Sequence, residues 1–260
     1  MVPPPMEIRL LGAHNTESST TRHVALLVDG VLALDAGGIN GALSLPEQDR
    51  LQALLITHRH FDHMKDVATL GLNTLNTSTI DLFAPPSAID ALTSHLMNGV
   101  IWGRLWEMPS PEKPSYRLHA VEEEASFEAA GHQVRAFPMP HSVPALGYLV
   151  TDGSRSFFYT GDTGPGCARV WSRFSTNLLV VETTYPNREV DLARLVQHLT
   201  PALLRDELLE WRAVASVLPP VLVVHHNPRF EAEIATELQE VARELGTAIT
   251  LGSEGMVVAA

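Results

Sequence analysis

The residues with the clearest capacity for chemistry form one short histidine cluster. His58, His60, Asp62 and His63 fall within six residues, directly after the apolar segment Ala53–Thr57. Imidazole nitrogens and carboxylate oxygens suit Zn²⁺, Mn²⁺ or iron better than Ca²⁺. A loop at the end of a strand can turn His58 and His60 toward one metal ion while Asp62 and His63 face a second. The spacing therefore predicts a dinuclear metal site and disfavours an ordinary polar surface turn.

Two metal ions need more ligands than this cluster supplies, and three later residues are candidates. His141 and Asp162 each follow an apolar run typical of a strand, and His225 follows the buried run Val221–Val224. Taken singly, each would be an ordinary loop residue. Because they follow the first cluster at the ends of strands, where loops gather functional groups, we expect them to complete the site. His226 competes with His225 for the last position.

The elements that must position these residues alternate between strands and helices. The order favours two sheets packed face to face with helices outside, an α/β sandwich in a single domain over residues 1–260. Residues 99–115 are expected to form a loop or lid. The expected strands are Met6–Leu11, His23–Val28, Val31–Leu34, Ala53–Thr57, Leu82–Ala84, Tyr116–Val121, Val134–Pro138, Gly147–Thr151, Ser156–Thr160, Leu178–Glu182, Val221–Val224, Ala248–Leu251 and Met256–Val258. The expected helices are Pro46–Gln52, Val67–Leu75, Pro86–Asn98, Asp191–Gln197, Pro201–Trp211 and Phe230–Leu245.

Composition narrows the class of partner. The chain has 18 Lys and Arg against 30 Asp and Glu, a net charge of −12. This balance argues against strong electrostatic binding to nucleic acid or to an anionic membrane. A small anionic substrate stays compatible, because a local metal site overrides the mean field. Cys167 is the only cysteine, which excludes an intrachain disulfide and a cysteine-rich zinc module. Without a signal peptide or a long apolar run, we expect a cytoplasmic protein.

The order of these motifs resembles the metallo-β-lactamase superfamily. Within it, the chain is most similar to the class II cyclic-nucleotide phosphodiesterases and the tRNA 3′-processing endonucleases (tRNase Z). The likeness runs from the strand end Leu34-Asp35-Ala36-Gly37 to the His225 motif. The resemblance implies an αββα sandwich with a two-metal site at one edge of the sheets, and it suggests a homodimer.

The resemblance also implies roles for the candidate ligands. It assigns His58, His60 and His141 to one metal ion. It assigns Asp62, His63 and His225 to the other. The carboxylate of Asp162 would be a ligand of both ions. Asp62 would also hold the nucleophilic water. His225 is preferred to His226 because the family places a proline three residues after the ligand, and Pro228 fits. The cofactors would be two divalent metal ions, with zinc favoured over manganese or iron, and Asp35 would orient a ligand histidine.

Glu182 and His198 help to separate the branches of the superfamily. The pair resembles the phosphodiester-cleaving branches, in which a glutamate orients a histidine that protonates the leaving oxygen. The alternative is a strand-end carboxylate and an unrelated histidine between two helices. The endonucleases usually have histidine before the glutamate, where this chain has Val181. Pro201, after His198-Leu199-Thr200, is closer to the cyclic-nucleotide form.

Together with the resemblance, these residues predict a metal-dependent phosphodiesterase acting on a small molecule. A hydroxide bridging the two metal ions would attack phosphorus in line and open a 3′,5′-cyclic nucleotide, first of all cyclic AMP, to the 5′-monophosphate. A tRNA 3′-endonuclease is the alternative, opposed by the charge and by the lack of a basic glycine-rich arm. A thioester or lactam hydrolase ranks third. A non-catalytic metal-binding protein is disfavoured because all seven expected ligands are present.

Four further residues have less certain roles. Trp102 and Trp106 could stack on a base, pack internally or contact a second subunit. His14 and Asn15 follow the first strand; they could touch substrate, but a surface loop is favoured. These assignments depend on burial, which the sequence does not determine.

Overall fold

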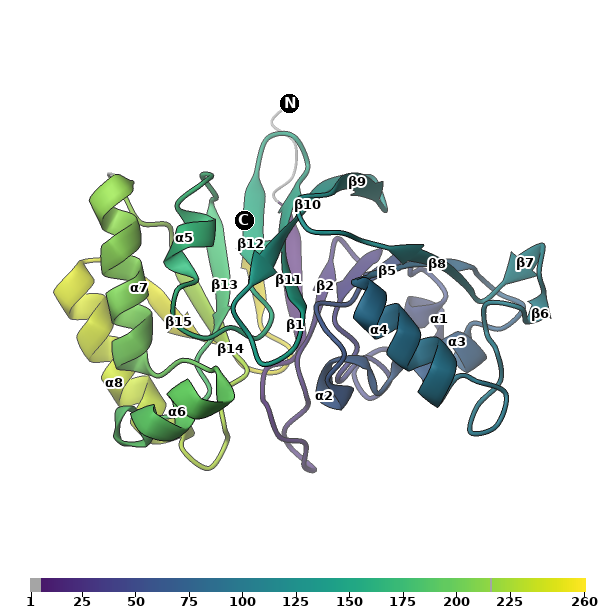
Figure 1. Cartoon of the computed structure of the whole chain (residues 1–260), viewed down its shortest axis with the longest axis horizontal. Coiled ribbons are helices and arrows are strands. Elements are labelled where there is room, and N and C mark those ends of the chain that lie inside the picture. The colour runs from purple at the N-terminus through teal and green to yellow at the C-terminus, as the bar shows by residue number, and fades with distance from the viewer. Residues whose placement is uncertain (1–5, 216) are drawn as a thin grey trace.

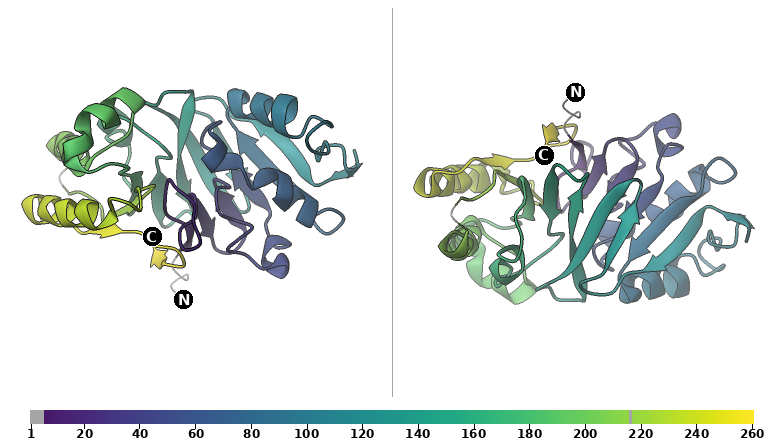
Figure 2. Two further views of the ribbon diagram at one scale, coloured as in Figure 1. Left: turned by 90° about the horizontal axis from the view of Figure 1, so that it is seen from below. Right: turned by 90° about the horizontal axis from the view of Figure 1, so that it is seen from above.

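Two β-sheets packed face to face, with helices on both outer faces, make up the chain (Figures 1 and 2). The computed structural model describes residues 6–215 and 217–260. Figure 2 shows the helices of the N-terminal half on one side and those of the C-terminal half on the other. The predicted αββα sandwich is therefore confirmed. Among the described residues, no helix combines the length and the apolar character needed to span a membrane.

The first sheet comes mainly from the N-terminal half. From one edge to the other, its strands are β16 (Val257–Ala259), β1 (Glu7–Gly12), β2 (Ala25–Val28), β3 (Leu32–Leu34), β4 (Ala53–Leu55), β5 (Ile80–Ala84) and β8 (Tyr116–Ala120). The strands from β16 to β3 are antiparallel, and those from β3 to β8 are parallel. The carboxyl ends of β3 and β4 therefore lie at the same edge.

The second sheet repeats this arrangement. Its strands, in spatial order, are β15 (Ile249–Leu251), β14 (Val221–Val224), β13 (Leu178–Glu182), β12 (Ser156–Tyr159), β11 (Ala145–Thr151), β10 (His132–Met139) and β9 (Ser126–Ala129). Strands β12 to β15 run parallel, while β9 to β12 are antiparallel. Because ligands collect beyond the carboxyl ends of parallel strands, the loops after β12, β13 and β14 are placed to build a site.

The helices divide between the two outer faces. Those of the first half are α1 (Leu45–Gln48), α2 (Phe61–Met64), α3 (Val67–Asn73), α4 (Pro86–Ala91) and the π-helical η1 (Leu92–Leu96). Those of the second half are α5 (Ala168–Trp171), the 3₁₀ turn η2 (Asn187–Glu189), α6 (Val190–Val196), α7 (Pro201–Val214) and α8 (Glu231–Leu245). Apolar side chains of both sheets, such as Leu55 and Tyr148, fill the space between them. Figure 1 places α2, α6 and the β10–β11 turn at the lower edge of the sandwich.

Most expected strands are present with ends shifted by one or two residues. Strand β9 was not predicted, because Phe127 is its only large apolar residue and its pairing with β10 defines it. Short strands β6 (Pro109–Ser110) and β7 (Lys113–Pro114) form a hairpin within the expected loop or lid. Helices α2 and α5, of four residues each, were also missed, since one turn leaves no periodic pattern.

Two expected helices end well before their predicted ends, and the helix expected over Val67–Leu75 ends slightly early, at Asn73. The helix expected over Pro46–Gln52 ends at Gln48, and the Gln52 amide bonds instead to the carbonyl of Val31, 2.9 Å away. The helix expected over Pro86–Asn98 is α-helical only to Ala91 and then widens into a π-helical turn. Conversely, α7 starts at Pro201 as predicted, with the Thr200 hydroxyl accepting a hydrogen bond from the Leu203 amide.

Candidate metal centre

All seven predicted ligands meet at one edge of the sandwich. His58 and His60 follow β4, and Asp62 and His63 lie in α2. The other three follow strands of the second sheet: His141 after β10, Asp162 after β12 and His225 after β14. Residues far apart in the sequence are thus brought together by the strand ends on which they were predicted to lie.

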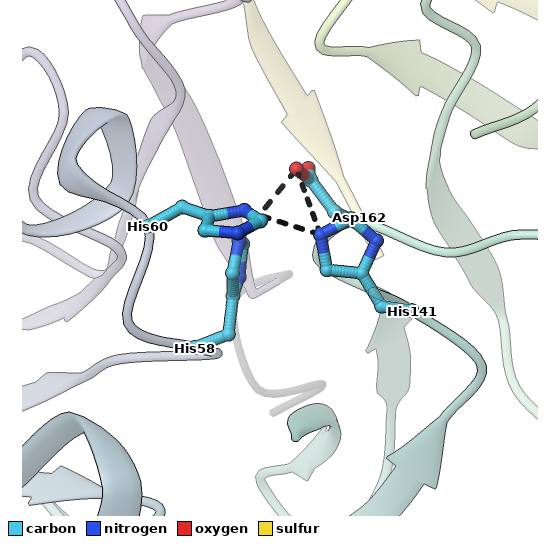
Figure 3. A group of neighbouring side chains, drawn as sticks. All are labelled: His58, His60, His141 and Asp162. Carbon is cyan, nitrogen blue, oxygen red and sulfur yellow. Dashed lines mark hydrogen bonds and ion pairs between the residues drawn. The ribbon is translucent and has the colours of Figure 1, made fainter. Parts of the chain in front are cut away.

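The first ligand group is shown in Figure 3 and comprises His58, His60, His141 and Asp162. One potential ligand atom from each lies within 4.8 Å of the others. Nδ1 of His60 is 3.2 Å from Nε2 of His141. Oδ2 of Asp162 is 3.7 Å from Nε2 of His58 and 3.9 Å from Nε2 of His141. Three imidazoles and a carboxylate therefore surround one small volume.

The second ligand group comprises Asp62, His63 and His225, again within 4.8 Å of one another. Nε2 of His225 lies 3.3 Å from Oδ2 of Asp62. Oδ1 of Asp162 lies 3.2 Å from Nε2 of His63 and 3.4 Å from Nε2 of His225. Asp162 therefore directs one carboxylate oxygen to each group, as a ligand shared by two ions would.

The polar atoms of this centre fit a pair of cations. Among the described residues, Nε2 of His58, Nε2 of His63 and Oδ1 of Asp162 are buried and have no hydrogen-bond partner. Buried polar atoms are nearly always paired, so such a convergence points to an ion. Burial also lowers the pKa of His58, His60 and His141. These three rings are neutral near pH 7 and can each offer a nitrogen lone pair.

Asp35 orients the ring of His63 through a contact with its Nδ1 atom. It follows β3 in a left-handed conformation, with φ 55°, and its carboxylate is fully buried. Oδ2 lies 2.7 Å from Nδ1 of His63 and accepts a 2.7 Å hydrogen bond from the Tyr159 hydroxyl. Oδ1 accepts a hydrogen bond from the Thr57 amide at 2.8 Å. The contact between Asp35 and His63 holds a proton on Nδ1 of His63 and leaves Nε2 free for a metal ion.

Asp35→Asn should therefore weaken metal binding while keeping the size of the side chain. We expect the affinity to fall by about 10–100-fold, as is usual when a carboxylate behind a ligand histidine is removed. Competition with a chromophoric chelator measures this affinity. Asp81→Asn is the matched control, since Asp81 pairs with His119 at 2.8 Å in the first sheet, away from the predicted ligands. Equal affinities in both variants would contradict the role given to Asp35.

His198 and Glu182 form a pair beside the two ligand groups. Nδ1 of His198 lies 2.6 Å from Oε1 of Glu182, whose buried carboxylate also accepts hydrogen bonds from Thr184. Burial disfavours the charged ring, but the attraction and the hydrogen bond of Glu182 outweigh it and raise the pKa of His198 to about 9. A potential ligand atom of His198 lies within 4.8 Å of Asp162 and His225. With Nδ1 held by Glu182, Nε2 is the nitrogen that can pass a proton to a substrate.

The two adjacent histidines after β14 face different surroundings. His225 has φ 60°; its Nδ1 lies 2.9 Å from the Thr184 hydroxyl, and its Nε2 faces Asp62 and Asp162. His226 lies outside both ligand groups and packs on His14, with ring centroids 4.1 Å apart. The geometry thus places His225 among the candidate metal ligands. This is the histidine that the position of Pro228 favoured over His226.

His14 and the two tryptophans of residues 99–115 are more buried than a surface position would be. The expectation that His14 lies on an exposed loop is wrong, because its residue is only 3% exposed. Its ring packs on His226 and bonds to Glu254, partners that local sequence cannot indicate. Trp102 and Trp106 pack against the apolar layer outside the first sheet, so internal packing is the alternative observed.

Three supporting residues were missed by the sequence reasoning. Tyr159 and Thr57 bond to Asp35, and Thr184 contacts both Glu182 and His225. Tyr159 had the pattern of an ordinary buried strand residue. Threonine at a strand end likewise carries no local signal, so only the assembled fold shows these contacts.

Fold and site together define a candidate metal centre on a metallo-β-lactamase fold. A family model described as the Beta-lactamase superfamily domain matches residues 26–226, and the chain belongs to this superfamily. The predicted resemblance is therefore confirmed at the level of the superfamily. Membership implies divalent metal ions, in keeping with the histidine and aspartate groups described above.

Individual relatives match over part or all of the chain. Ribonuclease Z of Mycobacterium sp. (strain KMS) is 29% identical over 153 residues, 55% of this chain and 53% of that protein. The chain thus spans about half the length of this curated relative. The anti-Pycsar protein Apyc1 of Bacillus phage 010DV004 is 28% identical over 179 residues, 61% of this chain and 69% of that protein. The crystal structure of unliganded yeast PDE1 superimposes with a TM-score of 0.81 at 18% identity, covering 98% of this chain and 99% of that chain, and shows a shared fold.

Proposed function

We propose that this protein is a metal-dependent phosphodiesterase that opens a 3′,5′-cyclic nucleotide, cyclic AMP in the first place, to the 5′-monophosphate. The observation that carries the proposal is the His198–Glu182 pair beside two ligand groups that share Asp162. A phosphodiester has a poor alkoxide leaving group, and a histidine held in its charged form can supply the proton that this group needs. Zinc is the proposed metal, since imidazole and carboxylate donors suit it.

Different residues of the chain have different roles in the proposed hydrolysis. Two divalent ions, when bound, supply charge that activates a water and neutralises the phosphate oxygens. The Asp62 side chain is 29% exposed, whereas that of Asp162 is 2% exposed. Burial opposes ionisation of Asp62, but its hydrogen bond to His225 and the nearby histidines outweigh this and lower its pKa. The ionised Asp62 can accept a hydrogen bond from the attacking water, while His198 protonates the leaving 3′ oxygen.

A tRNA 3′-processing endonuclease is the second candidate, and the likeness to ribonuclease Z favours it. The net charge of −12 opposes it, because RNA binding draws on many contacts between basic residues and phosphates. Val181, where the endonucleases usually have histidine, opposes it as well. No contact described above favours a thioester or lactam substrate.

A direct comparison of substrates tests the proposal. We expect the metal-loaded protein to hydrolyse cyclic AMP with kcat/KM on the order of 100-fold or more above that for precursor tRNA, because the substrate that the site is shaped to bind gains the transition-state contacts. Product separation by chromatography measures the first reaction, and gel analysis measures the second. A chelated sample is the control for both. Specific cutting of precursor tRNA, with cyclic AMP left intact, would overturn the proposal in favour of the endonuclease.

A further inference from the structure

A second histidine cluster includes His226, the residue that directly follows His225. One potential ligand atom each from His14, His226 and Glu231 lies within 4.8 Å of the other two. His14 follows β1, His226 follows β14 and Glu231 begins α8. None of the three is among the seven predicted ligands of the dinuclear centre. The cluster therefore needs an explanation of its own.

His226 is the most unusual member of this cluster. Its residue is 0% exposed, yet neither ring nitrogen has a hydrogen-bond partner within residues 6–215 and 217–260. Its ring meets that of His14 at 60°, with centroids 4.1 Å apart. A buried imidazole with both nitrogens unpaired is rare and costly, because nothing replaces the hydrogen bonds that water would make. An ion bound by one nitrogen removes part of this cost.

His14 is held as a metal-binding histidine usually is. Its Nδ1 lies 2.7 Å from Oε1 of Glu254, a carboxylate that also accepts a hydrogen bond from the Arg22 amide. This leaves Nε2, which is 3.4 Å from Oε2 of Glu231. A carboxylate on the far nitrogen fixes the tautomer and directs the other nitrogen to the ion. The pair repeats the arrangement of His63 and Asp35 in the main centre.

We propose that His14, His226 and Glu231 bind a third divalent transition-metal ion. Two imidazoles and one glutamate are a donor set that holds zinc with one coordination position left for water. The Glu231 side chain is 46% exposed, so that position can open to solvent. Glu254 does not coordinate in this arrangement but orients His14.

The site joins segments that flank the dinuclear centre. The backbones of His14 and His226 form a parallel bridge, and the His225 amide donates a 2.6 Å hydrogen bond to the carbonyl of Ala13. An ion held by His14 and His226 would tie the loop after β1 to the loop after β14, and Glu231 would add the start of α8. The third ion therefore braces the backbone that presents His225.

Metal counting tests this site. The full-length protein is stripped with a chelator, reloaded with excess Zn²⁺, passed through gel filtration and analysed by inductively coupled plasma mass spectrometry. We expect three ions per chain in the native protein and two in both His14→Gln and Glu231→Gln. His95→Gln is the matched control, because His95 is exposed on η1, and it should keep three. Near-UV circular dichroism checks that each variant is folded.

The difference between native protein and variants decides the outcome, whatever happens at the main centre. Equal metal counts in the native protein and in a folded Glu231→Gln variant would overturn the third site, because this substitution removes one of its three proposed ligands. A native count of two that stays at two in both variants would overturn it and leave the dinuclear centre standing. A loss of one ion in both variants from a native count below three would support the third site and count against the dinuclear centre.

Discussion

Replacing Asp162 by alanine is expected to disturb both halves of the proposed dinuclear centre at once. Its two oxygens face different groups, Oδ2 toward His58 and His141 and Oδ1 toward His63 and His225. No other predicted ligand approaches both groups in this way within the described residues. We expect loss of both ions and a fall in kcat on the order of 10⁴–10⁶-fold, as for residues that act as one catalytic unit.

Metal analysis and initial rates on cyclic AMP measure the effect of Asp162→Ala. Asp206→Ala is the matched control, since the Asp206 side chain is 54% exposed on α7, and it should keep both metal and activity. Thermal unfolding of both variants reports any general loss of structure. If Asp162→Ala lost an ion from one group and kept the other fully occupied, Asp162 would not be a shared ligand.

His198→Ala is expected to separate substrates by their leaving groups. A sugar 3′-alkoxide leaves poorly and needs a proton as the P–O bond breaks, whereas p-nitrophenolate leaves without one. General acid catalysis contributes typically about 10²–10⁴-fold. We expect a loss of that size on cyclic AMP and a much smaller loss on bis-p-nitrophenyl phosphate. Parallel kinetics on the two substrates measure the ratio.

Glu182→Gln should give the same selective loss more weakly, together with a shift in pH dependence. The pKa of His198 is raised to about 9 by Glu182, so the acid form persists up to about that pH and is lost above it. Without the carboxylate this pKa falls, and the alkaline limb of kcat on cyclic AMP should move to lower pH. His119→Ala is the control, since His119 pairs with Asp81 outside the site. Equal losses on both substrates, or loss of metal, would show that His198 has another role.

The histidine cluster and the strand ends were predictable because their signals are local. His58, His60, Asp62 and His63 lie within six residues, and each later candidate comes within a few residues of the end of an apolar run. Strand ends of a parallel sheet meet at one edge, so this rule was sufficient to bring Asp162 and His225 to the same place. His141 joins them because β10 and β12 are both antiparallel to β11 and therefore run in the same direction.

Other features depend on partners far along the chain. The bond between His14 and Glu254 joins residues 240 positions apart, and neither residue stands in a recognisable motif. Tyr159 bonds to Asp35 across 124 positions, although its strand has an ordinary apolar pattern. Strand β9 forms because β10 pairs with it, since its own side chains carry little apolar periodicity. Tertiary contacts determine each of these, so local patterns could not predict them.

The most direct test of the proposed activity is a metal titration of the stripped protein with cyclic AMP as substrate. The rate of hydrolysis and the identity of the product are followed together by chromatography. We expect no hydrolysis without metal, a rate that rises as divalent ions are added, and 5′-AMP as the only product. Hydrolysis that is unaffected by stripping, or no hydrolysis when the dinuclear centre is shown by metal analysis to be filled, would contradict a metal-dependent cyclic-nucleotide phosphodiesterase.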